Sequence, residues 1–196
     1  MEASPKMVSL EEARTQVKVV ARRLALMHLA YARMLVDELG EATAKDIVVK
    51  AMMEYGRLVG ERNKTGGQDL PYFGLHEKYI YGEQEYLDTR ELDLKEGQVF
   101  DWSRFKVKGC VLAEVFQEMG ETELGRLYCY VDAAKSMAVD PDHKLVHTAC
   151  EPCGDDHCAF EMLPTADDEK QDFIRQNLRW KDVDPILADT GKDDDK

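Results

Sequence analysis

The chain has 196 residues, of which 44% are hydrophobic and 33% charged, which excludes wholesale disorder and leaves no room for two independent enzymes. Its 26 basic and 39 acidic residues give a formal net charge of -13, so phosphate backbones are repelled and no nucleic-acid partner is expected. No apolar run reaches the about 20 residues that cross a bilayer, and the N-terminus lacks the basic and apolar regions of an export signal. We therefore expect a cytoplasmic protein without membrane contact, whose five cysteines are reduced.

A long helix is predicted at the N-terminus, where apolar residues recur at alternating spacings of three and four. Ser9 and Glu12 have the pattern of a capping box at its start, and Gly40 suits its end. The regular spacing indicates packing against another long helix, either in the same chain or across a homodimer. The apolar stripe consists of Leu10, Ala13, Val17, Val20, Leu24, Met27, Tyr31 and Met34.

A second helix is predicted to begin at Thr43 and to end within residues 63–67. Together the two helices form an N-terminal helical pair, residues 1–67. The second helix is expected to bury a stripe made of Ile47, Val48, Ala51, Met52, Tyr55, Leu58 and Val59.

Two β-hairpins are predicted in the following part of the chain. Apolar residues alternate with charges within residues 86–94 and 98–108, with a turn at Glu96 and Gly97. Residues 144–150 and 157–163 show the same alternation around Gly154. Each hairpin would supply two strands to one antiparallel sheet of about four strands.

Helical spacing predicts helices over residues 110–119, 122–137 and 167–180, which would pack on the sheet. The fold class is therefore α+β, with a ligand-binding or catalytic core over residues 68–182. The charged end of the chain, residues 183–196, is predicted to be an acidic, disordered tail.

The densest chemical signal lies in the second hairpin, where three thiols and an imidazole occur within nine positions: Cys150, Cys153, His157 and Cys158. With a turn centred on Gly154, Cys150 faces Cys158, and both thiols lie on one face of the sheet. Two interpretations stay open. The thiols are small buried hydrophobic side chains, or the four residues hold Zn²⁺ in a tetrahedral site, to which the C-x2-C pair contributes half.

A third interpretation uses Cys129 and Asp132, which lie three residues apart on a predicted helix and so project from one face. A nearby carboxylate raises the pKa of a thiol, so a nucleophilic Cys129 needs a cation beside it. Asp132 as a general base needs only partial burial and a bound water. The alternative is a core cysteine next to a solvated aspartate.

Two short motifs carry a resemblance to a known family. Tyr128, Cys129 and Asp132 form Y-C-x-x-D, and residues 154–160 read G-D-x-x-C-x-F, after two N-terminal helices. This order resembles the L-2-amino-thiazoline-4-carboxylic acid hydrolase family. The second motif is also similar to the end of vinyl-reductase-like small-molecule-binding domains, which are α+β ligand-binding modules.

The first resemblance implies a hydrolase without a cofactor that opens a carbon–nitrogen bond of a small cyclic amidine, of 2-aminothiazoline-carboxylate type, by general-base-activated water. It implies catalytic roles for Cys129, Asp132 and Cys158. The second resemblance implies a non-catalytic small-molecule-binding or sensor module. Cys150 and Cys153 are not part of either pattern, so a metal or redox role for them stays open. The implied substrate-binding residues are Tyr128, Asp155, His157 and Phe160.

Overall fold

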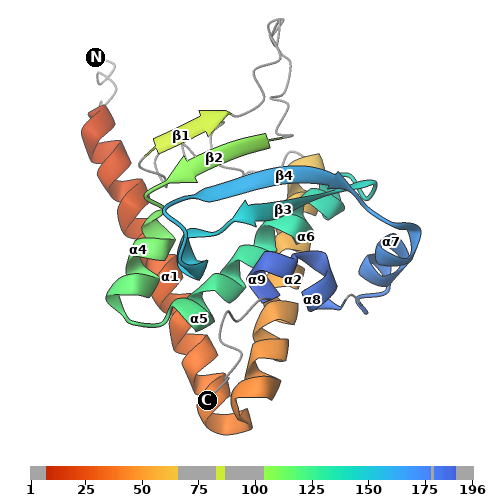
Figure 1. Ribbon diagram of the computed structural model, residues 1–196. Helices are drawn as coiled ribbons and strands as arrows, with labels where there is room; N and C mark the ends of the chain where they lie inside the picture. The colour runs from red at the N-terminus through yellow and green to blue at the C-terminus, as the bar shows by residue number, and fades with distance from the viewer. Residues whose placement is uncertain (1–7, 66–82, 87–103, 178, 189–196) are drawn as a thin grey trace, which may run out of the picture.

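The computed structural model describes residues 8–65, 83–86, 104–177 and 179–188. Two long helices, α1 (Leu10–Leu39) and α2 (Glu41–Thr65), meet at Gly40 and run back beside each other. A twisted antiparallel sheet lies on the far side of a layer of shorter helices (Figure 1). The predicted α+β fold class is confirmed.

The sheet has four strands in the order β1-β2-β4-β3, and every neighbouring pair is antiparallel. The second predicted hairpin supplies two of them. The first is matched only in part: one strand lies within residues 98–108 as predicted, whereas the other covers residues 83–86 and meets the predicted strand over residues 86–94 only at Tyr86. The strands of the first hairpin are β1 (Glu83–Tyr86) and β2 (Arg104–Lys108). The turn predicted at residues 96–97 lies outside the described residues. The strands of the second hairpin are β3 (His143–Ala149) and β4 (Cys158–Pro164).

The predicted register of the second hairpin holds at Ala149 but is wrong by one residue from His147 to His143. Ala149 lies opposite Ala159 and His147 lies opposite Phe160, because the chain bulges at Thr148 between them. A bulge inserts one unpaired residue and shifts every pair beyond it. Cys150 directly follows the last residue of β3, beyond the Ala149–Ala159 pair, and lies outside the ladder.

The middle of the chain forms shorter helices than the spacing predicts. The predicted helix over residues 122–137 is interrupted by a 3-10 turn, and the one over residues 167–180 ends at Ile174, after which Gln176 adopts a positive φ of 57°. The elements are α4 (Val111–Glu118), α5 (Thr122–Gly125), the 3-10 turn η1 (Arg126–Cys129), α6 (Tyr130–Val139), the 3-10 turn η2 (Glu151–Cys153), α7 (Asp167–Ile174), α8 (Trp180–Val183) and α9 (Pro185–Ala188).

The ends of α1 are as predicted, but the stripe that it buries is not. Ser9 Oγ accepts a hydrogen bond from the Glu12 N–H at 3.2 Å, and the Glu12 carboxylate accepts one from the Ser9 N–H at 2.9 Å. Val20 and Tyr31 of the predicted stripe are exposed. Small side chains on another face let α4 and α5 approach instead. The buried residues of α1 are Ala21, Ala25, His28, Leu29 and Ala32.

The second helix also turns a different face inward. It begins at Glu41, directly after Gly40. Val48 is buried as predicted, whereas Tyr55 and Leu58 are exposed. The buried residues of α2 are Ala44, Val48, Val49, Gly56 and Gly60, which again are mostly small.

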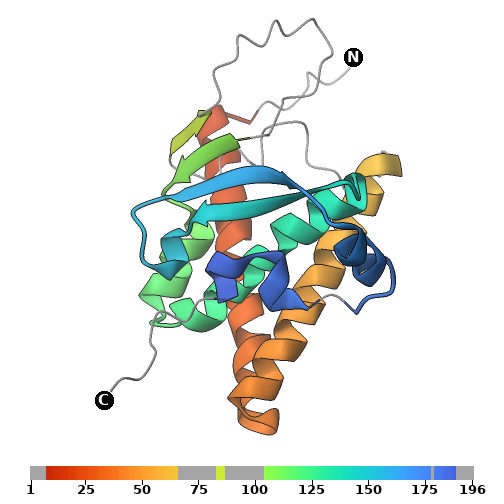
Figure 2. The same ribbon diagram turned by 45° about the vertical axis from the view of Figure 1, so that its right-hand side comes forward.

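Small residues are buried in α2 because this helix contacts the backbone of α6. A Cβ atom at Gly56 would lie 2.5 Å from the Val131 carbonyl oxygen. One at Gly60 would lie 2.5 Å from the carbonyl oxygen of Lys135. Neither position has room for a side chain, so the two glycines set how closely α2 and α6 pack. Figure 2 shows α6 between α2 and the strands β3 and β4.

The first part of the predicted tail is ordered. Val183, Asp184 and Leu187 are buried. Asp184 Oδ2 accepts a hydrogen bond from the His147 backbone N–H at 2.9 Å and lies 2.8 Å from His147 Nδ1. This buried pair fastens the segment before α9 to strand β3. Residues 189–196 of the predicted tail lie outside the described part of the chain.

One hydrophobic core joins the N-terminal helices to the rest of the molecule. It contains Leu29 of α1 and Val48 of α2 together with Phe116, Tyr130 and Leu187. The boundary predicted near residue 67 stays a prediction, since the segment around it is only partly described. None of the helices in the described ranges is long and apolar enough to cross a membrane.

Replacing Gly56 by alanine is expected to lower the free energy of unfolding by about 1–3 kcal/mol, because the new methyl group would overlap the backbone of α6. Helix propensity alone would act in the opposite direction by about 1 kcal/mol. Urea denaturation followed by circular dichroism measures the change. Asn63→Ala, at an exposed position of α2, is the control and should change the free energy by less than about 0.5 kcal/mol. A Gly56→Ala protein more stable than the wild type would contradict the close contact.

Candidate active site

The two motifs meet in space where η1 leads into α6 and where η2 leads toward β4. Cys129 ends η1, and Asp132 lies in the first turn of α6. The chain just before η1 lies close against α4 because Gly125, the last residue of α5, has no side chain: a Cβ atom there would lie 2.2 Å from Cγ of Phe116. Tight packing before the motif therefore fixes where Cys129 and Asp132 project.

Two further residues, Cys110 and Glu151, belong to this region and were not singled out from the sequence. The backbone N–H of Cys110, which precedes α4, donates to Glu151 Oε2 at 3.3 Å. The backbone N–H of Glu151 donates to Cys158 Sγ at 3.2 Å. Glu151 thus links the start of α4 to the cysteine of β4. No sequence pattern reveals this link, because Cys110 and Glu151 are 41 residues apart.

The pKa values of three free thiols in this region are raised by burial and by two nearby carboxylates. Burial is the main cause that raises the pKa of Cys110 to about 11 and that of Cys158 to about 12. Burial also raises the pKa of Cys129 well above its ordinary value. The negative charge of Asp132 adds to all three shifts, and that of Glu151 adds to those of Cys110 and Cys158. All three thiols are therefore neutral at physiological pH.

Asp132 is the most accessible predicted catalytic group of this cluster. Its side chain is 20% exposed, so solvent reaches it without surrounding it. Lys135 Nζ lies 3.2 Å from Asp132 Oδ1, one turn further along α6, and orients the carboxylate. Cys158 is buried, whereas Cys129 is only partly covered. A carboxylate within reach of solvent therefore acts on three neutral thiols.

The residues predicted to bind substrate are not gathered at one point. Tyr128 lines a groove between α1 and α2, and its ring lies edge-on to that of His28 at a centroid distance of 5.5 Å. Phe160 is buried beside His147, with ring centroids 4.4 Å apart. His157 lies at the tip of the hairpin, where its Nδ1 pairs with Asp156. Their roles in binding remain predictions.

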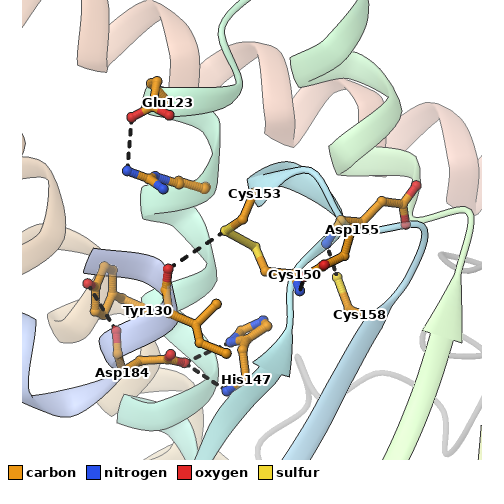
Figure 3. Close-up of a disulfide and its surroundings, with 11 residues drawn as sticks. Glu123, Tyr130, His147, Cys150, Cys153, Asp155, Cys158 and Asp184 are labelled. Carbon is orange, nitrogen blue, oxygen red and sulfur yellow. Dashed lines mark hydrogen bonds and ion pairs between the residues drawn. A yellow bond between two sulfur atoms is a disulfide. The ribbon is translucent and has the colours of Figure 1, made fainter. Parts of the chain in front are cut away.

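A disulfide joins Cys150 to Cys153, where the sequence predicted reduced thiols. Figure 3 shows it at the turn of the hairpin, near Cys158. Cys150 is fully buried, whereas Cys153 is exposed. Asp155, a predicted binding residue, accepts a hydrogen bond from the Cys150 N–H at 2.7 Å. The disulfide and these hydrogen bonds close the loop that carries Glu151 over Cys158.

The four residues of the predicted zinc site do not fit a metal in this arrangement. Cys150 and Cys153 are bonded to each other, and His157 is turned toward Asp156. In the part of the chain that the structure describes, no three His, Cys, Asp or Glu side chains are grouped to hold a metal ion. A zinc site at Cys158 and these residues would first require reduction of the disulfide.

The family comparison covers both elements of this site. The family model for L-2-amino-thiazoline-4-carboxylic acid hydrolase matches residues 20–162. The chain belongs to this hydrolase family. The match confirms the resemblance drawn from the two motifs, and it extends from the middle of α1 almost to the end of β4. Neither the curated proteins nor the solved structures gave a significant match.

Replacing Cys153 by serine is expected to lower the free energy of unfolding by about 2 kcal/mol under oxidising conditions, since the disulfide closes a short loop. The variant should match the wild type once a reductant is present, because the hydrogen bonds of the loop remain. Chemical denaturation with and without a phosphine reductant measures both cases. An equal loss under reducing conditions would mean that Cys153 acts through packing and not through the disulfide.

Proposed function

We propose that this protein hydrolyses a small cyclic amidine of 2-aminothiazoline-carboxylate type, with Asp132 as the general base. The observation that carries the proposal is the position of Asp132: a partly exposed carboxylate whose charge acts on Cys110, Cys129 and Cys158, inside the segment matched by the hydrolase family. Perturbed titratable groups of this kind cluster at functional sites.

The proposed reaction is the addition of water to an sp² carbon that is flanked by heteroatoms. Asp132 removes a proton from the attacking water and then returns it to the ring atom that leaves. Cys129 and Cys158 are neutral thiols, so they act as weak S–H donors that line the reacting centre. A thiolate nucleophile is disfavoured, because burial and two nearby carboxylates oppose loss of the thiol proton.

Ring opening at the amidine carbon breaks one of two bonds. Loss of the ring nitrogen, which the family resemblance implies, leaves a free amine in the product. Loss of the ring sulfur leaves a free thiol. Reagents specific for amines and for thiols distinguish the two products, and a thiol product would overturn the carbon–nitrogen assignment while keeping the hydrolysis.

A second candidate function is non-catalytic binding of a small molecule. The groove between α1 and α2, of about 240 Å³, favours it, because its lining is almost entirely apolar and includes Tyr128 of the first motif. Calorimetric binding of a 2-aminothiazoline carboxylate without any turnover would support this alternative over hydrolysis.

Asp132→Asn is expected to lower kcat by at least about 100-fold with little change in KM, because the amide cannot accept the proton of water. The asparagine preserves the shape of the side chain, and circular dichroism should show an unchanged fold. Asp142→Asn, at an exposed carboxylate beyond α6, is the control and should retain full activity. Unchanged turnover of the Asp132→Asn protein would remove Asp132 from this role.

The pH profile separates the carboxylate from a thiolate mechanism. With Asp132 as the base, no thiol has to lose its proton, so kcat/KM should not rise between about pH 7 and pH 9. With Cys110 or Cys158 as the nucleophile, activity should rise with pH towards their pKa values of about 11 and 12. A steady tenfold rise per pH unit would therefore contradict the proposal. Initial rates in overlapping buffers of constant ionic strength measure the profile.

A further inference from the structure

The predicted apolar stripe of α1 is largely exposed in the described part of the chain. Val20, Met27, Tyr31 and Met34 are between 52% and 69% exposed, and Leu24 among them is only half-buried. They recur at spacings of three and four over about four turns of the helix, so they lie on one side of it. Single exposed apolar residues are ordinary on a protein surface, but a continuous stripe of this length is not.

The neighbouring helix extends this apolar surface. Tyr55 and Leu58 of α2 are 38% and 46% exposed. The groove of about 240 Å³ lies between the two helices, with Met27 and Tyr31 on one wall and Tyr55 on the other. The layer of α4 and α6 separates the helix pair from the sheet (Figures 1 and 2). We call this surface the outer face; it consists of Val20, Leu24, Met27, Tyr31, Met34, Tyr55 and Leu58.

We propose that the outer face binds a second copy of this chain, with the two α1 helices antiparallel. At the exposed fractions given above, the outer face offers on the order of 700 Å², close to the about 800 Å² that each partner buries in a standard interface. It also exceeds the largest apolar patch of a typical monomer, about 300–600 Å². Two copies of the α1–α2 pair would form a four-helix bundle.

The spacing along α1 is complementary to itself when the helix is reversed. With two α1 helices antiparallel, Leu24 of each copy faces Met27 of the other. Val20 of each copy then faces Tyr31 of the other, one layer further from the centre. Met34 of each copy faces Val17 of the other. The apolar layers from Val17 to Met34 thus meet one another, which is the packing that a two-fold axis requires.

Charge favours the antiparallel arrangement over the parallel one. Residues 14–23 contain four basic and no acidic side chains. A parallel pair would place this basic segment beside its own copy, whereas an antiparallel pair moves the two segments apart. The antiparallel pair also brings Arg14 of one copy level with Asp37 of the other. Like charges placed together at an interface are destabilising, so charge selects the direction of pairing.

The oligomeric state of the full-length protein tests the proposal. Sedimentation equilibrium of the wild type should give a dimer, and Tyr31→Glu should raise the dimer Kd at least tenfold, because a charge would be buried without a partner. Leu26→Glu is the control: Leu26 is another exposed apolar side chain of α1, 46% exposed, that lies off the stripe. It should leave the dimer Kd unchanged. A monomeric wild type, or equal weakening by both variants, would overturn the proposal.

A mixing experiment tests the direction of pairing. Val20→Glu and Tyr31→Lys should each weaken their own dimer, because a charge then faces an apolar residue in two layers. In an antiparallel heterodimer of the two variants, the glutamate introduced at position 20 of one chain faces the lysine introduced at position 31 of the other chain. The second layer keeps the native pair of Tyr31 and Val20. Mixing should therefore restore a dimer. A mixture that dissociates as readily as each variant alone would overturn the antiparallel register.

Discussion

The contact between the backbones of α2 and α6 is the constraint on which the rest of the structure depends. Gly56 and Gly60 allow α2 to contact the backbone of α6. The helix α6 in turn contacts β3. Because α6 begins directly after η1, its position also determines where Cys129 and Asp132 lie relative to Cys158. The candidate site is therefore a product of helix packing, not of the hairpin alone.

The other side of the site is held by the turn of the second hairpin. The disulfide and Asp155 close the loop that carries Glu151, and the buried pair of His147 and Asp184 fastens the chain beyond β4 to the sheet. Cys158 is buried and Cys110 and Cys129 are partly covered, and burial together with the nearby carboxylates raises the pKa of all three thiols, so they stay protonated. Asp132, in contrast, has a side chain that is 20% exposed, so its carboxylate stays within reach of solvent.

Features set by neighbours in the sequence could be predicted, and features set by distant contacts could not. The capping box at Ser9 and the end at Gly40 are local, and they were correct. Periodicity shows which residues share a face of a helix, but not which face the rest of the chain covers, so it did not reveal the small residues that α1 and α2 bury. The bulge at Thr148 and the link between Cys110 and Glu151 have no local signal, since both depend on partners far along the chain.

Packing within the subunit restricts the residues on one side of α2 but not those on the other. On the inner side, Gly56 and Gly60 have no space for even a methyl group, so the fold itself admits a single residue type at each position. On the outer side, Leu58 is exposed in the described chain, and packing within one subunit sets no such limit. Substitutions on the inner side of α2 should therefore affect folding, whereas substitutions on its outer side should affect association between copies of the chain.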